Sequence, residues 1–404
     1  MKPILKKISK TWLSKKIPNF YRSLYEKIDF NTRIIGIKGA RGSGKTTILR
    51  QYAKNSNYKP SQILYVSCDS PIMADVDLFE LATSFEQYGG KLLLIDEIHK
   101  SANFSAHIKS MYDFLNIQVI FTGSSAIILN HESGDLSRRA TIHYLSAMSL
   151  REFISLKENI DIKSYTLKDI LQNHEDISYE ILEQIKPLEQ YSKYVKYGAY
   201  PFFKESITDY PSRLLDVINV TIESDLSTIF NIDASKQNVL KRVLSMLCST
   251  TPYEISKSKL SKDTDISWAT LSKYLTYMRQ GDLINLIDAP NNHKKLNKAS
   301  KMLLNNPNLF YVLCSEPNIG SIRESYFVSQ LNHMHNIHYH DMGDFLIDDK
   351  YTFEICKSGF ASLHGGASKG DKQIKDISNG FVVRDDIETG YDNIIPLWLF
   401  GFLY

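Results

Sequence analysis

The sequence has few cysteines, little net charge and no long hydrophobic run. Its 404 residues contain four cysteines, which are far apart and form no Cys-x-x-Cys pair: Cys68, Cys248, Cys314 and Cys356. This spacing favours reduced thiols in a cytoplasmic protein over disulfide bonds or a zinc site. The formal net charge is only +3, so the overall charge does not by itself call for a nucleic-acid partner.

The lack of a long apolar run argues against a membrane span. No apolar stretch approaches the roughly 20 residues that a spanning helix needs. The N-terminal stretch MKPILKKISKTWLSKKIPNF is basic and has no apolar core of a secretory signal. Four of its apolar residues recur at helical spacing: Ile4, Leu5, Ile8 and Trp12. The spacing predicts a packed helix with a solvated basic face; a surface for nucleic acid or anionic lipid is the alternative.

The strongest signal is a strand, a glycine-rich loop and a helix. The apolar run Ile34 to Ile37 leads into GARGSGKTT, and helical spacing follows from Ile48. This is the order of a P-loop, whose backbone N–H groups and helix N-terminus hold phosphates. Lys45 is expected at the β- and γ-phosphates of ATP, and Thr46 at Mg²⁺. The expected nucleotide-binding residues are Gly39, Ala40, Arg41, Gly42, Ser43, Gly44, Lys45, Thr46 and Thr47.

A buried strand that ends in acidic residues completes the predicted site. The stretch KLLLIDEIHK has four consecutive apolar residues before Asp96, as expected for a parallel strand covered on both faces. Asp96 then lies at the carboxyl end of the strand, where α/β sheets bind ligands, and is expected to hold Mg²⁺ through water. Glu97 is placed to polarise the attacking water.

Two later segments offer further catalytic side chains. The strand NIQVIFTGSS ends near Ser124, our first choice for contact with the γ-phosphate or the water, with Thr122 second. A plain strand-to-loop turn is the alternative. Arg138 and Arg139 are candidates to stabilise transition-state charge, in cis or from a neighbouring subunit. The alternative is that the two arginines are exposed or form ion pairs. Residues 31–125 alternate strands and helices, which predicts an α/β fold with a doubly wound parallel sheet.

These motifs resemble the AAA+-type P-loop ATPases of bacteria and archaea whose C-terminal half is a conserved domain of unassigned function. The matching elements are GARGSGKTT, LLIDEI, TGSS, RRATIHYLSAMSLREF, YGAYP and IPLWLFGFLY. Arg139 keeps the arginine of the family, whereas Arg138 stands in place of a glycine and Ala147-Met148 in place of Pro-Leu. The resemblance implies an ATPase fold that uses ATP and Mg²⁺, a winged-helix region and a nuclease-like C-terminal fold, with no assigned substrate.

Four domains are predicted along the chain. Residues 1–150 form the ATPase core with the basic N-terminal helix, 151–235 a helical lid and linker, 236–306 a winged helix, and 307–404 a restriction-endonuclease-like domain.

The predicted winged helix carries local positive charge. Three helical patterns with a tight turn precede a strand and a hairpin. From Lys257 to Lys301 there are nine Lys or Arg and four Asp, a local charge of +5, which favours contact with DNA phosphates. A protein–protein module is the alternative. The DNA candidates are Lys257, Lys259, Lys273, Lys294 and Lys295.

The C-terminal segment carries the acids of a restriction-endonuclease-like core, which hold Mg²⁺ while a lysine orients water. The candidates are Glu324, Asp344, Glu354 and Lys357. In YTFEICKSG, Glu354 and Lys357 are one residue too far apart, so they point to opposite faces of a strand unless a bulge re-aims one of them. Lys372 is a possible substitute. The prediction is a vestigial, non-catalytic nuclease module.

The favoured function is an Mg²⁺-dependent ATPase that couples hydrolysis to a conformational change and acts with DNA or a protein partner. Two alternatives stay open: an ATP-regulated metal-dependent nuclease, and a DNA- or partner-binding switch with weak ATP turnover. The sequence does not name the substrate or decide whether the chain forms a homo-oligomer.

Overall fold

The structure, a computed structural model, divides the chain into two compact units, residues 1–146 and 147–404. It describes residues 2–123, 138–248, 253–254, 256–290, 301–340, 342–356, 374 and 377–404. Several predicted site residues lie outside the described residues: Ser124, Lys294, Lys295, Lys357 and Lys372. Nothing is described of the side chain of Lys257.

The first unit is built on a five-stranded sheet with the order β2-β3-β4-β1-β5. Its strands are β1 (Ile34–Gly39), β2 (Ile63–Ser67), β3 (Leu92–Asp96), β4 (Gln118–Gly123) and β5 (Thr141–Leu145). All neighbouring strands pair in parallel. Their carboxyl ends therefore meet at one edge of the sheet, and the predicted α/β parallel sheet is confirmed.

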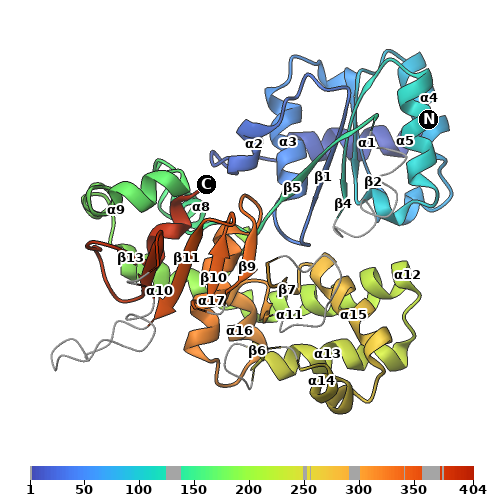
Figure 1. Ribbon diagram of the computed structural model, residues 1–404. Helices are drawn as coiled ribbons and strands as arrows, with labels where there is room; N and C mark the ends of the chain where they lie inside the picture. The colour runs from blue at the N-terminus through green and yellow to red at the C-terminus, as the bar shows by residue number, and fades with distance from the viewer. Residues whose placement is uncertain are drawn as a thin grey trace. The chain divides into compact units, whose positions relative to one another are not determined.

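Helices cover both faces of this sheet (Figure 1). They are α1 (Pro3–Ser14), α2 (Ser23–Lys27), α3 (Lys45–Asn55), α4 (Leu78–Gln87) and α5 (Phe104–Phe114), with short 3₁₀ turns at Pro60–Gln62, Pro71–Met73 and Ile98–Lys100. Along β3, Leu92 and Leu94 pack into the core on the α3 side, and Leu93 and Ile95 into the core on the α4 and α5 side. The continuous apolar run is thus explained by alternation between two covered faces.

The basic N-terminal helix α1 packs against the edge strand β2, while its lysines stay exposed. Leu5 and Trp12 are buried. Ser9 Oγ accepts a hydrogen bond of 2.9 Å from the N–H of Tyr65. An edge strand presents unpaired N–H groups, so α1 satisfies one of them and covers the sheet edge.

The second unit contains two sheets. The smaller sheet is antiparallel and has three strands in the order β6-β8-β7. The larger sheet has five strands in the order β13-β12-β11-β10-β9. The strands are β6 (Tyr253–Glu254), β7 (Ile284–Ile287), β8 (Lys301–Leu304), β9 (Ile337–Tyr339), β10 (Phe345–Ile347), β11 (Tyr351–Cys356), β12 (Gly380–Arg384) and β13 (Ile394–Pro396). In the larger sheet β9, β10 and β11 pair antiparallel, and β11, β12 and β13 pair parallel.

The rest of the second unit is mostly helical. Its helices are α8 (Leu150–Glu158), α9 (Leu167–Leu182), α10 (Pro187–Tyr197), α11 (Tyr210–Val220), a π-helical turn (Thr221–Leu226), α12 (Ser227–Phe230), α13 (Ala234–Cys248), α14 (Lys257–Thr264), α15 (Trp268–Gln280), α16 (Pro307–Leu313) and α17 (Ile319–Leu331), with 3₁₀ turns at Pro201–Lys204 and Leu397–Phe402. Over the described residues, no helix is both long and apolar enough to cross a membrane.

Hydrogen bonds join the three segments predicted as separate domains in this half of the chain. Asn332 Nδ2, in the last segment, donates to Asn285 Oδ1, in the segment before it, at 3.1 Å. Gln330 Nε2 donates to Tyr194 Oη at 3.0 Å, and the N–H of Ala199 to Asn308 Oδ1 at 2.8 Å. Residues 147–404 therefore pack as one compact unit, and the predicted boundaries after 235 and 306 fall within it.

The structure contains a disulfide bond, whereas the sequence predicted reduced thiols. Cys248, at the end of α13, is bonded to Cys314, just after α16. The two cysteines are 66 residues apart in sequence, and the packing of α13 against α16 brings them together. The prediction of four reduced thiols is wrong for this pair, because spacing along the chain does not report distance in space. Cys68 and Cys356 take no part in this bond.

Candidate nucleotide-binding site

The loop between β1 and α3 has the backbone of a phosphate cradle. Gly42 (φ 80°) and Gly44 (φ 104°) adopt left-handed conformations, which glycine reaches without the steric cost of a side chain. The helix α3 begins at Lys45, so its first N–H groups and the positive end of its dipole follow directly on the loop. The nine predicted nucleotide-binding residues all lie in the end of β1, this loop or the first turn of α3.

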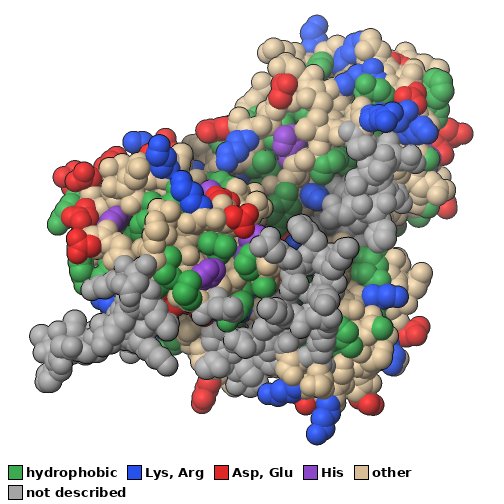
Figure 2. Space-filling model, in the orientation of Figure 1, with side chains coloured by type: hydrophobic (Ala, Val, Ile, Leu, Met, Phe, Trp, Pro, Cys, Tyr) green, Lys and Arg blue, Asp and Glu red, His purple; other side chains and the backbone are tan. Residues whose placement is uncertain are grey.

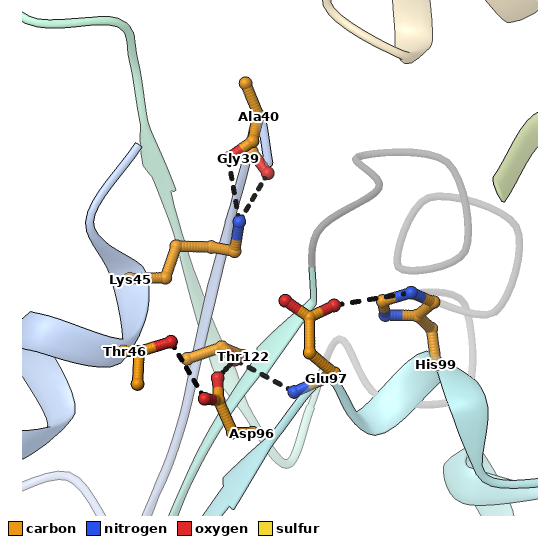
Figure 3. Close-up of polar contacts among 8 residues, drawn as sticks. All are labelled: Gly39, Ala40, Lys45, Thr46, Asp96, Glu97, His99 and Thr122. Carbon is orange, nitrogen blue, oxygen red and sulfur yellow. Dashed lines mark hydrogen bonds and ion pairs between the residues drawn. The ribbon is translucent and has the colours of Figure 1, made fainter. Parts of the chain in front are cut away.

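Lys45 is held at the loop by backbone carbonyl groups (Figure 3). Its Nζ donates to the carbonyl oxygens of Gly39 at 2.9 Å and Ala40 at 2.8 Å, and the residue is only 4% exposed. Ser43 Oγ is buried and has no hydrogen-bond partner among the described residues. Buried polar and charged groups are costly unless paired. A buried ammonium group and an orphaned hydroxyl at the N-terminus of α3 therefore fit a polyanionic ligand such as the phosphates of ATP.

Asp96 receives hydrogen bonds from three hydroxyl groups on three elements. Thr46 Oγ1 on α3 donates to Asp96 Oδ2 at 2.8 Å. Tyr65 Oη on β2 donates to the same oxygen at 3.0 Å, and Thr122 Oγ1 on β4 donates to Oδ1. Burial and the Asp96 charge raise the pKa of Tyr65, which keeps this hydroxyl protonated as a donor. The carboxylate is thus fixed in orientation next to the first turn of α3.

The pair of Thr46 and Asp96 fits a magnesium ion. Hydroxyl and carboxylate oxygens suit Mg²⁺, which proteins hold through one or two such side chains, substrate phosphates and water. Within the described part of the chain, no three His, Cys, Asp or Glu side chains are placed to hold a metal ion alone. Thr46 and Asp96 would therefore suit a metal that the nucleotide phosphates also help to hold.

Glu97 has a backbone conformation that turns it away from the line of β3. Its φ is 51°, a left-handed conformation that costs energy for a residue other than glycine and is frequent at functional sites. Its N–H donates to Thr122 Oγ1 at 3.1 Å. Figure 3 shows the carboxylate between Lys45 and His99, and His99 Nε2 lies 3.5 Å from Glu97 Oε2. The buried imidazole therefore helps to hold the carboxylate that was predicted to activate water.

Thr122, at the end of β4, contacts both acidic residues of the site. Thr122, the second choice, donates to Asp96 and accepts from Glu97, so it links both acidic residues. Ser124, the first choice, lies outside the described residues.

Arg139 lies away from the phosphate loop. It precedes β5, whose first residue Thr141 pairs with Ile35 at the start of β1. The loop follows Gly39, at the other end of β1, about 13 Å away along the strand at roughly 3.3 Å per residue. The Arg139 guanidinium contacts Asp113 on α5, with Nε 3.0 Å from Oδ1. This arrangement does not support the predicted action of Arg139 in cis, and the ion-pair alternative describes it better.

Three residues near the site escaped the sequence interpretation. Tyr65 contacts Asp96, and His99 contacts Glu97. Both could have been found in the sequence, because each is a polar residue within or shortly after a buried apolar strand. Arg22 is 5% exposed and donates to the carbonyl oxygens of Ser43 at 2.7 Å and Ser146 at 2.8 Å. Arg22 belongs to no motif, so the sequence offered no signal for it.

The C-terminal acids also come together. Phe345 pairs with Phe353 in the antiparallel register of β10 and β11, so Asp344 lies opposite Glu354. Lys301 contacts both Asp344 and Glu324 on α17, and so links Glu324 to the other two acids. The sequence interpretation selected the three acids and missed Lys301.

Comparisons with known proteins match two parts of the chain. Residues 31–154 match the model of a family described as AAA domain, and residues 188–318 match a family described as a domain of unknown function. The uncharacterized protein MJ1637 of Methanocaldococcus jannaschii is 28% identical over 302 residues, which is 70% of this chain and 63% of that protein. The match therefore spans less than two thirds of the relative's own length.

Two solved structures show distant similarity to this chain. The Orc1 protein of Aeropyrum pernix, determined in complex with DNA, is 8% identical, covers 80% of this chain and 90% of that chain, and has a TM-score of 0.32. The Hsp104–ADP complex of S. cerevisiae is 15% identical, covers 68% and 41%, and has a TM-score of 0.33. Similarity this weak says nothing about the ligands or partners of the present chain.

Proposed function

We propose that this chain, whose residues 31–154 form an AAA-type P-loop domain, is an Mg²⁺-dependent ATPase that couples hydrolysis to a conformational change. The observation that carries the proposal is the contact of 2.8 Å between Thr46 and Asp96 beside the buried Lys45. It unites the metal-binding and phosphate-binding side chains of a P-loop site at one edge of the sheet.

Each site residue has a distinct task in this proposal. Lys45 and the loop N–H groups bind the phosphates, and Thr46 and Asp96 would hold Mg²⁺, which would neutralise negative charge of the phosphates. Glu97 orients the attacking water and accepts its proton. Thr122 fixes the peptide N–H of Glu97 and the carboxylate of Asp96 in one arrangement. Preorganised polar groups of this kind need little rearrangement during the reaction.

Phosphate release from ATP, measured with the full chain, tests the proposal. Lys45→Ala removes the buried ammonium group and is expected to abolish turnover. Lys109→Ala removes an exposed lysine of α5 and is expected to leave turnover unchanged. Equal ATPase rates in the wild type and Lys45→Ala would reject the assignment.

A second candidate activity is DNA contact through α13, α14, α15 and the sheet β6-β8-β7. Three helices with a strand between the first two, followed by the hairpin β7–β8, have the order of a winged helix-turn-helix. Lys259 on α14 and Lys273 on α15 are exposed. On the face drawn in Figure 2, Lys and Arg side chains are interspersed with Asp and Glu, which supports weak, salt-dependent binding at most. A protein partner is the alternative occupant.

Fluorescence anisotropy of a labelled DNA duplex tests this second activity. At about 50 mM salt, where phosphate contacts are strongest, the wild type is expected to bind and the double variant Lys259→Ala/Lys273→Ala to bind less. Lys168→Ala, at an exposed lysine of α9, serves as the matched control. Absence of wild-type binding at this salt concentration would reject DNA contact and favour a protein partner.

A further inference from the structure

A buried lysine lies among the acidic residues of the nuclease-like segment. Lys301 is the first residue of β8 and is 5% exposed. Its Nζ lies 2.6 Å from Glu324 Oε2 and 2.9 Å from Asp344 Oδ1. Glu324 is likewise 5% exposed. The three side chains form a polar cluster largely removed from water.

The acids of this cluster come from a helix and a strand pair. Glu324 projects from α17, and Asp344 immediately precedes β10. Asp344 Oδ2 accepts a hydrogen bond of 2.8 Å from the N–H of Ile355 on β11, which fixes its carboxylate beside the neighbouring Glu354. Carboxylate oxygens are typical ligands of a divalent cation, but no three acidic side chains of the described residues are placed to hold one as they stand. A lysine ammonium group lies between two of the acids in this cluster.

The surroundings of Lys301 stabilise a charged ammonium group. Its Nζ lies 4.8 Å from the ring centroid of Phe345 and 6.0 Å from that of Tyr339, within the range of cation–π attraction. Burial alone would lower the pKa of Lys301, but Glu324 and Asp344 outweigh it and raise this pKa above its usual value. Lys301 therefore remains a cation, and its desolvation is offset by two carboxyl groups and two aromatic faces.

The cluster also joins the two sheets of the second unit. Lys301 and Leu304 belong to β8 of the three-stranded sheet, and Ser325 Oγ on α17 donates to the carbonyl of Leu304 at 2.9 Å. The N–H of Tyr339 on β9 donates to the carbonyl of Asp288, just after β7, at 3.0 Å. The lysine thus reaches into the acidic cluster from an element that is itself anchored, so it is not a freely swinging surface side chain.

We propose that Lys301 is an internal cation that takes the place of a divalent metal among Glu324, Asp344 and Glu354. By satisfying the carboxyl groups from within the fold, it closes this cluster to Mg²⁺ and Mn²⁺. The nuclease-like segment then acts as a rigid part of the second unit and not as a metal-dependent enzyme. This inference is independent of the ATPase proposal, because none of its residues belongs to the P-loop unit.

Mn²⁺ binding to the full chain, measured by titration calorimetry without nucleotide, tests the inference. All proteins carry Asp96→Asn, so that the P-loop site does not contribute. We expect the protein that keeps the native Lys301 and carries only Asp96→Asn to bind no Mn²⁺ through Asp344. Lys301→Met keeps the apolar stem of the side chain and removes its charge. This variant is expected to bind one Mn²⁺ at least about tenfold more tightly than the protein that keeps Lys301. Adding Asp344→Asn should abolish this gained site, and Lys350→Met, at an exposed lysine, should gain none.

Two results would overturn the inference. The first is that the protein with the native Lys301 binds Mn²⁺ and loses this binding on Asp344→Asn. The lysine and the metal would then occupy the cluster together. The other is a folded Lys301→Met variant, verified by circular dichroism, that binds no more Mn²⁺ than its parent. If that variant does not fold, the first measurement still decides, since it needs only the native lysine: binding that depends on Asp344 overturns the inference, and its absence supports it.

Discussion

The hydroxyl of Thr46 lies 2.8 Å from the Asp96 carboxylate, although 50 residues separate them in sequence. Thr46 belongs to the first turn of α3, and Asp96 ends β3. The strand order places β4 between β1 and β3, so the side chains meet across the carboxyl edge of a parallel sheet. Asp96 also accepts a hydrogen bond from Tyr65 through the oxygen that binds Thr46, which makes its orientation sensitive to a residue outside the motifs.

Tyr65→Phe is expected to raise the Mg²⁺ concentration needed for half-maximal ATPase activity several-fold, because Asp96 loses one of its three orienting donors. The free energy of unfolding should fall by about 1 kcal/mol, typical of a single hydrogen bond. Tyr52→Phe is the matched control, since it removes the bond of 2.7 Å from Tyr52 to Gln118 in the same unit. The control should lose similar stability without a change in Mg²⁺ dependence. An equal Mg²⁺ shift in both variants would contradict a specific role for Tyr65.

Glu97→Gln is expected to lower the ATPase rate by roughly 10²–10⁴-fold, the usual contribution of a general base, with nucleotide affinity unchanged. His99→Gln should have a smaller effect, because His99 only orients the Glu97 carboxylate. Single-turnover hydrolysis and equilibrium binding of a fluorescent ATP analogue separate the two steps. A Glu97→Gln protein with the wild-type single-turnover rate would rule Glu97 out as the base.

Reduction of the disulfide between Cys248 and Cys314 is expected to destabilise the second unit. For a loop closed over 66 residues, the chain-entropy model gives about 4 kcal/mol. Urea unfolding with and without a reducing agent measures the change, and the Cys248→Ser variant should match the reduced protein and not respond to reductant. Under denaturing, non-reducing conditions only Cys68 and Cys356 should react with a thiol reagent. Four reactive thiols would show that the bond is absent.

The acidic cluster should make stability depend on pH. Burial, partly opposed by Lys301, raises the pKa of Glu324 from 4.5 to about 8. The folded state therefore holds a proton that the unfolded state has released, so this contribution is fully present below about pH 4.5 and is lost as pH rises through 8. Glu324→Gln mimics the protonated acid and should flatten the decline between pH 5 and 8 in urea unfolding curves. A variant that keeps the slope of the wild type would contradict this account; Glu175→Gln, on the surface of α9, is the control.

The sequence by itself determined the P-loop and the sheet that carries it. A P-loop is a local structure: the turn of its glycines, the start of α3 and the position of Lys45 all depend on residues next to one another in the chain. Asp96 was also accessible, because an acid after a buried apolar strand must lie at the edge of the sheet. The second unit's acids were found for the same reason, since each stands at a recognisable place on its own helix or strand.

Only the tertiary structure decided which distant side chains complete these sites. The register of β5 on β1 placed Arg139 at the edge opposite the loop, and the packing of α13 on α16 joined Cys248 to Cys314. The approach of β8 to α17 put Lys301 beside Glu324. Such contacts depend on how whole elements pack, and a single sequence encodes that packing in many weak interactions, whereas a motif encodes local backbone geometry in a few adjacent residues.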